Sequence, residues 1–204
     1  MTDEIPSLPE LEFDEGSHVY RIGSEILPSV TTIMKPLSYK YYKAIPDHVL
    51  EKAAGRGSAI HNAIENWIKF GIEDIPQEYR GYFDAFRDWW DRYRPTVIGS
   101  ELRLYHKLLR YAGTADLVCR IGDELWIIDY KSTSVLSEML VRVQLEAYAK
   151  ALESFGVKVH RKGALHLKKD GSWAFPAFEA GDSIAWRGFG SLKTIYDYVR
   201  SYDK

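Results

Sequence analysis

Two acids and one lysine lie close together in residues 111–132, a stretch that ends in the letters IIDYKS. Asp129 and Lys131 are two positions apart, so on a strand their side chains point to the same face. Gly122 and Asp123 separate this apolar run from an earlier one, and a Gly-Asp pair in that position indicates a hairpin turn. The sequence therefore predicts a two-stranded hairpin that carries reactive groups near its open end.

The position of the turn also predicts which residues face one another. With Gly122 and Asp123 at the tip, the numbers of paired residues add up to 245, which places Asp116 opposite Asp129. Directly opposed residues have β-carbons about 5 Å apart, and two carboxylates at that spacing repel each other unless a cation lies between them. Hard oxygen ligands suit Mg²⁺ or Mn²⁺. The alternative is a solvated hairpin face with an Asp-Lys surface pair, but both residues interrupt a run that is otherwise apolar.

Length and composition are those of a soluble enzyme of one domain, residues 1–204. The chain has 204 residues, of which 46% are hydrophobic and 27% charged. It has no apolar run of about 18 residues, so we expect no contact with a membrane. Residues 1–16 are acidic and contain proline, unlike a targeting segment, which predicts a loose lead-in and a cytoplasmic protein.

A single cysteine, Cys119, excludes internal disulfides and argues against an iron–sulfur cluster. The net charge of −2 gives no overall attraction to nucleic acid. A local basic groove is still possible, because positive residues gather in two stretches of the chain. These are Lys35, Lys40, Lys43, Lys52 and Arg56 in the first, and Arg161, Lys162, Lys168 and Lys169 in the second.

The order of elements predicts an α/β fold with a mixed central sheet flanked by helices. Helices are expected over residues 47–70, 78–93, 135–155 and 183–202, the second with an aromatic stripe that faces the core. Strands are expected over residues 18–22, 25–27 and 101–109, in the central hairpin, and over residues 163–168 and 173–178. Pro36 is expected to stop a short segment that follows Ser29.

The letters GTAD and IIDYKS resemble the signature of the PD-(D/E)XK nuclease superfamily. In this resemblance Asp116 is the first acid, Asp129 the second and Lys131 the lysine. It implies a restriction-endonuclease-like core and a divalent metal, Mg²⁺ or Mn²⁺. It also implies the backbone carbonyl of Tyr130 as a further metal ligand.

Other segments resemble the RecB-like exonuclease branch, which includes the mitochondrial genome maintenance exonuclease and phage exonucleases. The resemblance assigns His61 in GRGSAIHNAIE to the metal, Gln144 and Tyr148 in QLEAY to orienting the site, and Ser29 and Thr31 in PSVT to the DNA strand. Glu65 and Glu101 are secondary candidates. Without the resemblance, Ser29 is equally a helix cap and His61 with Glu65 a helical surface pair.

The resemblance implies a metal-dependent DNA exonuclease of replication, recombination or repair, with phage recombination as an analogy and an unknown partner protein. Lys131 would orient or deprotonate the attacking water and offset charge on the phosphate. Two alternatives remain: a non-catalytic DNA-binding or assembly protein on a nuclease fold, and a structure-specific endonuclease.

Overall fold

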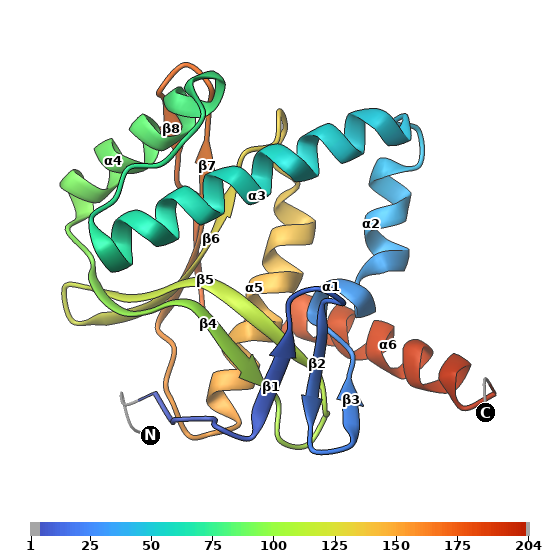
Figure 1. Cartoon of the computed structure of the whole chain (residues 1–204). Helices are drawn as coiled ribbons and strands as arrows, with labels where there is room; N and C mark the ends of the chain where they lie inside the picture. The colour runs from blue at the N-terminus through green and yellow to red at the C-terminus, as the bar shows by residue number, and fades with distance from the viewer. Residues whose placement is uncertain (1–4, 203–204) are drawn as a thin grey trace.

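A six-stranded sheet forms the centre of the structure, a computed structural model that describes residues 5–202 (Figure 1). The strand order is β4-β5-β6-β7-β8, and β9 also pairs with β7. Only β6 and β7 are parallel, so the sheet is mixed and the predicted α/β class is confirmed. The strands are β4 Thr96–Tyr105, β5 Ala112–Ile121, β6 Glu124–Lys131, β7 Arg161–Leu167, β8 Trp173–Ala174 and β9 Ala177–Glu179.

The central hairpin has the predicted register. Pairs run from Ile121 opposite Glu124 to Leu117 opposite Ile128, and their numbers add up to 245. Gly122 at the turn has a φ of 60°, a left-handed conformation that glycine adopts without strain. The paired residues end one position short of Asp116 and Asp129, so the two acids lie where β5 and β6 stop exchanging ladder hydrogen bonds.

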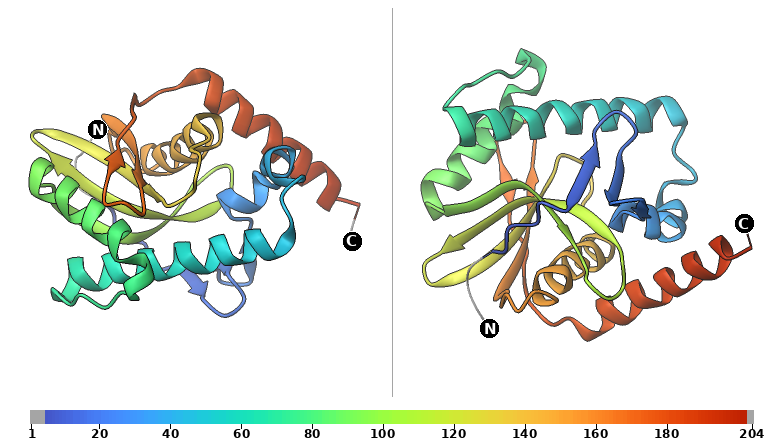
Figure 2. Two further views of the ribbon diagram at one scale, coloured as in Figure 1. Left: turned by 90° about the horizontal axis from the view of Figure 1, so that it is seen from above. Right: turned by 60° about the horizontal axis from the view of Figure 1, so that its bottom comes forward.

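Helices cover both faces of this sheet (Figure 2). One face packs against α1, α5 and α6, and the other against α3 and α4. A short helix, α2, connects the two layers, and a 3₁₀ turn, η1, lies between α3 and α4. The bounds are α1 Val30–Ile33, α2 Lys35–Tyr42, α3 Asp47–Phe70, η1 Gln77–Tyr79, α4 Arg80–Tyr93, α5 Glu138–Glu153 and α6 Ser183–Arg200. None of the helices in residues 5–202 has the length and apolar character needed to cross a bilayer.

Alternation along β6 divides its side chains between the two layers. Ile128 and Tyr130 join the core of α3 and α4, which is rich in aromatic rings, whereas Ile127 joins the core of α5. Phe86 and Trp89 on α4 are fully buried there, so the predicted aromatic core stripe is confirmed. Asp129 and Lys131 have the parity of Ile127 and therefore point towards α5.

The N-terminal part differs from the prediction in two places. A strand, β1 Leu11–Asp14, lies inside the expected loose lead-in; it pairs with β2 Val19–Ile22, which pairs with β3 Glu25–Leu27. Residues 1–4 of that lead-in lie outside the described residues. The short segment after Ser29 does end before Pro36, at Ile33, but the chain continues directly as α2 from Lys35, because proline fits the first turn of a helix, where its missing N–H is not needed.

Three boundaries in the second half are also corrected. β4 begins at Thr96 rather than residue 101, and α5 begins at Glu138 rather than residue 135. The strand expected over residues 173–178 divides into β8 and β9, because Phe175 and Pro176 interrupt it. Lys162, expected in a basic surface stretch, is fully buried in β7, where its ammonium pairs with the fully buried Glu146 of α5.

This buried ion pair gives a prediction for stability. Without Lys162, the fully buried Glu146 keeps only the partly exposed Lys150, whose ammonium lies 3.7 Å away, so Lys162→Met should destabilise the fold by up to about 3–5 kcal/mol. The double variant Lys162→Met with Glu146→Leu should recover most of that loss, since no buried charge is then unmatched. Urea unfolding measures both, with the exposed Lys168→Met as the control. An unfolding midpoint for Lys162→Met equal to that of the control would contradict the argument.

Candidate active site

Three acids lie side by side on three neighbouring strands. Pairs on either side of Glu101 and Asp116 are Ser100 with Leu117 and Leu102 with Ala115, and their numbers add up to 217. The same sum, 101 + 116, places Glu101 opposite Asp116. Asp129 follows on β6, on the other side of Asp116. Glu101 has a φ of 51°, so the backbone of β4 is locally distorted at the point where its carboxylate joins the row.

A histidine from α3 completes this group. His61 Nδ1 lies 3.6 Å from Asp116 Oδ1 and 3.9 Å from Glu101 Oε1. One ligand atom of each of these three residues lies within 4.8 Å of the others, a spacing that suits a common metal ion. α3 can carry this residue because Ile60 and Ile64, next to it on the helix, are fully buried against α4 and the sheet.

One hydrogen bond of His61 decides which of its two ring nitrogens carries the proton. Nε2 lies 3.1 Å from the carbonyl oxygen of Tyr130, and a carbonyl only accepts, so Nε2 must carry the proton. In the neutral ring, Nδ1 then directs a lone pair towards two carboxylates. Three electron-rich groups that converge in this way fit a divalent cation, and one nitrogen with several oxygens is a donor set that Mg²⁺ or Mn²⁺ accepts.

Burial makes the charged forms of these acids costly. Burial, opposed by His61 and Lys131 and aided by the nearby Asp129, raises the pKa of Asp116 to about 6. Burial together with Asp116 and Glu65 raises the pKa of Glu101 to about 8. Each acid thus resists ionisation while the others are charged, which is the condition that a bound cation relieves.

Asp129 and Lys131 form the second half of the site, beside α5. Lys131 Nζ lies 2.5 Å from Asp129 Oδ2, and Gln144 bridges the two by donating Nε2–H to Asp129 Oδ1 at 2.8 Å and accepting from Lys131 Nζ at 3.2 Å. Burial would lower the pKa of Lys131, but Asp129 and Asp116 outweigh it and raise that pKa. The lysine is therefore held as a cation at a fixed place.

The remaining partner on α5 is Tyr148, whose hydroxyl accepts a hydrogen bond from Gln144 Nε2 at 3.2 Å. Its ring packs on Gly113, where an added β-carbon would lie 2.6 Å from Tyr148 Cε1. Gly113 therefore permits the close approach of β5 and α5 that brings Gln144 to Asp129. The GTAD and QLEAY segments are adjacent for this reason.

Tyr130 connects the two halves through its backbone. Its N–H donates to Asp116 Oδ2 at 2.6 Å, and its carbonyl accepts from His61 as described. The carboxylate of Asp116 thus takes the place of a ladder acceptor where strand pairing stops. The expected role of the Tyr130 carbonyl as a metal ligand stays a prediction, because its observed partner is His61.

The other candidates lie outside this group. Ser29 caps α1, with its hydroxyl accepting from Thr32 N at 3.0 Å, and contacts Thr31 Oγ1 at 3.0 Å; Thr31 itself is exposed. Glu65 forms an ion pair with Lys69 one turn further along α3. The expected contacts of Ser29 and Thr31 with DNA stay predictions, and the structure gives the hydroxyl of Ser29 a capping role.

Comparison with known families gives a match over most of the chain. The family model of the PD-(D/E)XK nuclease superfamily matches residues 43–174, a range that contains His61, Asp116, Asp129, Lys131 and Gln144. The chain belongs to this superfamily. The predicted family and the restriction-endonuclease-like core are thereby confirmed. A search of curated proteins gave no match.

Two solved structures are similar in fold. The protein solved as SSO0001 is 12% identical with a TM-score of 0.46, over 86% of this chain and 79% of that one. An alkaline exonuclease from Laribacter hongkongensis is 10% identical with a TM-score of 0.42, over 70% of this chain and 82% of that one. Both TM-scores are below 0.5, so the family assignment rests on the sequence match.

Glu101 has a more central place than the sequence indicates. The sequence marks it only as a secondary candidate at a strand start, yet its carboxylate lies 3.9 Å from His61 Nδ1 and opposite Asp116. Its place follows from the pairing of β4 with β5, whose register shifts between Val97 and Gly99. An irregularity of this kind has no clear signature in a single sequence. The pairing of Glu101 with Asp116 could have been predicted only if that register were known.

The raised pKa values predict how stability depends on pH without metal. Free carboxyls titrate near pH 4, so between about pH 4 and pH 8 the unfolded chain has released protons that folded Asp116 and Glu101 retain. Stability should therefore fall as pH rises through this window. Thermal unfolding of wild type against Asp116→Asn/Glu101→Gln isolates the effect, since the double variant lacks both groups. Equal pH slopes for the two proteins would contradict the assignment.

Divalent cations should restore the stability that the metal-free protein loses as pH rises. At pH 8, Mn²⁺ at one hundred times its dissociation constant should stabilise the wild type by about 2.7 kcal/mol. The double variant Asp116→Asn/Glu101→Gln should gain little, because the ligands are altered. The midpoint of thermal unfolding with and without Mn²⁺ is the measurement. An equal gain in both proteins would place the ion elsewhere.

Proposed function

We propose that this member of the nuclease superfamily is a metal-dependent deoxyribonuclease that acts as an exonuclease on linear DNA. The observation that carries the proposal is the arrangement of His61, Glu101 and Asp116 within 4.8 Å, beside the Asp129-Lys131 pair. Binding of DNA alone would not require carboxylates that face a phosphate. The row of acids is understandable if a cation mediates between protein and substrate.

Each residue has a defined task in this proposal. His61 Nδ1 and the oxygens of Glu101, Asp116 and Asp129 would hold Mg²⁺ or Mn²⁺, with the Tyr130 carbonyl as a further ligand. A bound divalent ion lowers the pKa of water and polarises a phosphate, which permits hydrolysis at neutral pH.

Lys131 supplies the positive charge next to that position. Because Asp129 and Asp116 raise its pKa, the lysine is protonated at neutral pH, which favours orienting the water and offsetting phosphate charge over removing a proton. Gln144 positions Lys131 and Asp129 together, so its role is to fix geometry. The DNA class and the exonuclease mode are supported by the motifs that resemble RecB-like exonucleases.

The nuclease proposal predicts metal-dependent digestion of end-labelled linear DNA. EDTA should abolish the activity, and Lys131→Ala should lower kcat by about 10²–10³-fold, the usual cost of one charge-stabilising group. Asp129→Ala should be at least as damaging. Lys168→Ala, which changes an exposed lysine just beyond the end of β7, is the matched control. Full activity of Lys131→Ala, or activity in EDTA, would refute this mechanism.

The exonuclease mode has a separate test. A circular single-stranded DNA has no ends, so an exonuclease should leave it intact while degrading the same molecule after linearisation. Gel analysis of both forms with Mg²⁺ gives the answer. Cutting of the circle would instead identify an endonuclease. Metal-independent binding without any cleavage would favour a DNA-binding protein on a nuclease fold.

A further inference from the structure

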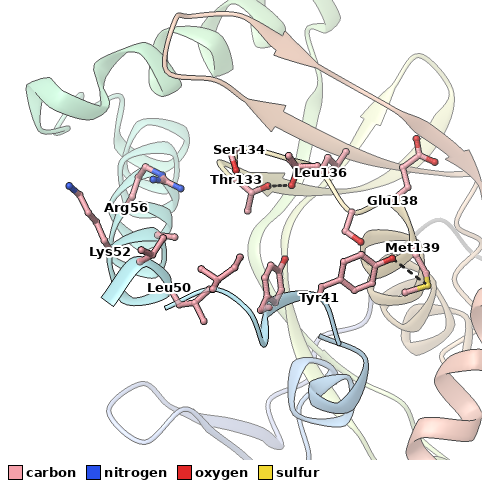
Figure 3. Close-up of a pocket in the computed structure, with 15 residues that line it drawn as sticks. Tyr41, Leu50, Lys52, Arg56, Thr133, Ser134, Leu136, Glu138 and Met139 are labelled. Carbon is pink, nitrogen blue, oxygen red and sulfur yellow. Dashed lines mark hydrogen bonds between the residues drawn. The ribbon is translucent and has the colours of Figure 1, made fainter. Parts of the chain in front are cut away.

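A groove of about 720 Å³ lies beside the active site and has no role in the mechanism above. One side is formed by α2 and the start of α3, and the other by the segment that joins β6 to α5 (Figure 3). Lys52 and Arg56 lie on the α3 side, Thr133 and Ser134 lie across from them, and Tyr41 and Met139 lie at one end. We call this the α2–α3 groove.

The groove is continuous with the catalytic residues along the chain. Thr133, which lines the groove, follows two positions after Lys131, the last residue of β6. The backbone at Thr133 is held in place, because His166 Nε2 on β7 hydrogen-bonds to the carbonyl oxygen of Thr133 at 2.6 Å. A ligand in the groove would therefore meet the site at Lys131.

The α3 wall is cationic. Lys52 and Arg56 are one helical turn apart and share a face. Among residues 5–202, neither forms an ion pair. The guanidinium of Arg56 lies 5.7 Å from the ring of Tyr82, and its Nε has no hydrogen-bond partner among the described residues. Glu138 is the one acid among the residues that line the groove.

The rest of the lining suits rings and sugars. Val135 is 78% exposed, Tyr41 46% and Met139 40%, which are high values for apolar side chains around a depression. The hydroxyl of Ser137, in the same segment, is buried without a partner. A cationic wall facing aromatic and apolar side chains is the pattern that binds a single nucleic-acid strand, whose backbone meets the charges while its bases stack. A duplex offers no free base faces to such a surface.

We infer that the α2–α3 groove binds an unpaired DNA strand adjacent to the phosphate that is cleaved. The inference extends the proposed nuclease function. It rests on that function for one point, namely that the bound strand runs towards Lys131. Lys52 and Arg56 bind backbone phosphates, and Tyr41, Val135 and Met139 contact bases and sugars. The protein consequently prefers a substrate with an unpaired end over a blunt duplex.

Binding can be measured apart from cleavage. Fluorescence anisotropy of a labelled single-stranded oligonucleotide is recorded in EDTA over a range of salt concentrations. The variant Lys52→Gln/Arg56→Gln should weaken binding about tenfold or more and reduce the salt slope, because each lost phosphate contact removes about 0.7 from the slope. The exposed Lys158→Gln, at the opposite end of α5, is the matched control. Lys52→Glu is the second variant, since it leaves the contact of Arg56 with Tyr82 intact.

Kinetics supply the second readout. On a duplex with an unpaired tail, the groove variants should raise KM about tenfold while kcat stays within twofold, because the reacting groups are unchanged. On a blunt duplex the wild type and the variants should be alike. Binding and KM for the tailed substrate equal to those of Lys158→Gln would overturn the inference, as would equally tight binding of blunt duplex.

The two proposals fail in different ways. If the wild type cleaves DNA and the groove variants behave like it, the inference about the groove is wrong and the nuclease proposal stands. If the single strand binds in a groove-dependent way but is not cleaved in Mg²⁺, the nuclease proposal is wrong and the groove remains a binding site.

Discussion

Repulsion among buried carboxylates is the constraint around which this site is organised. β-Pairing places Glu101, Asp116 and Asp129 on three adjacent strands, and burial deprives them of the water that would screen them. The protein answers in two ways. Lys131 and Gln144 neutralise and hold Asp129, whereas Glu101 and Asp116 keep their protons to unusually high pH and face a histidine lone pair. The first half is balanced within the chain, whereas the second has the spacing that a divalent cation would complete.

The surrounding fold supplies the rigidity that such an arrangement needs. Each strand that carries an acid is packed on both faces, by α3 and α4 on one side and α5 on the other. Gly113 lets α5 approach β5 closely, and Tyr130 ties Asp116 to His61 through one peptide unit. Groups that repel can be kept at fixed distances only where the packing around them is dense and the backbone polar groups are satisfied.

Local patterns were sufficient to predict the hairpin, its register and the bounds of α3, because turn residues and helical periodicity act over short distances. Asp129, Lys131 and Gln144 could be placed for the same reason, aided by the family resemblance. Features set by contacts between distant segments were predicted less well. Glu101 was only a secondary candidate, because its place depends on a register shift in β4, and the burial of Lys162 depends on Glu146 of another element. β1 was missed as well, although it pairs with the nearby β2 across a short turn.

The double use of the Tyr130 peptide also couples the two sides of the site. Its N–H holds Asp116 on β5 and its carbonyl holds His61 on α3, so one rigid peptide unit connects two of the three residues that converge. A main-chain unit cannot swing outwards as a side chain on a flexible stem can. A substitution that moves β6 at this point would therefore displace an acid and the histidine together, and with them the spacing of the whole group.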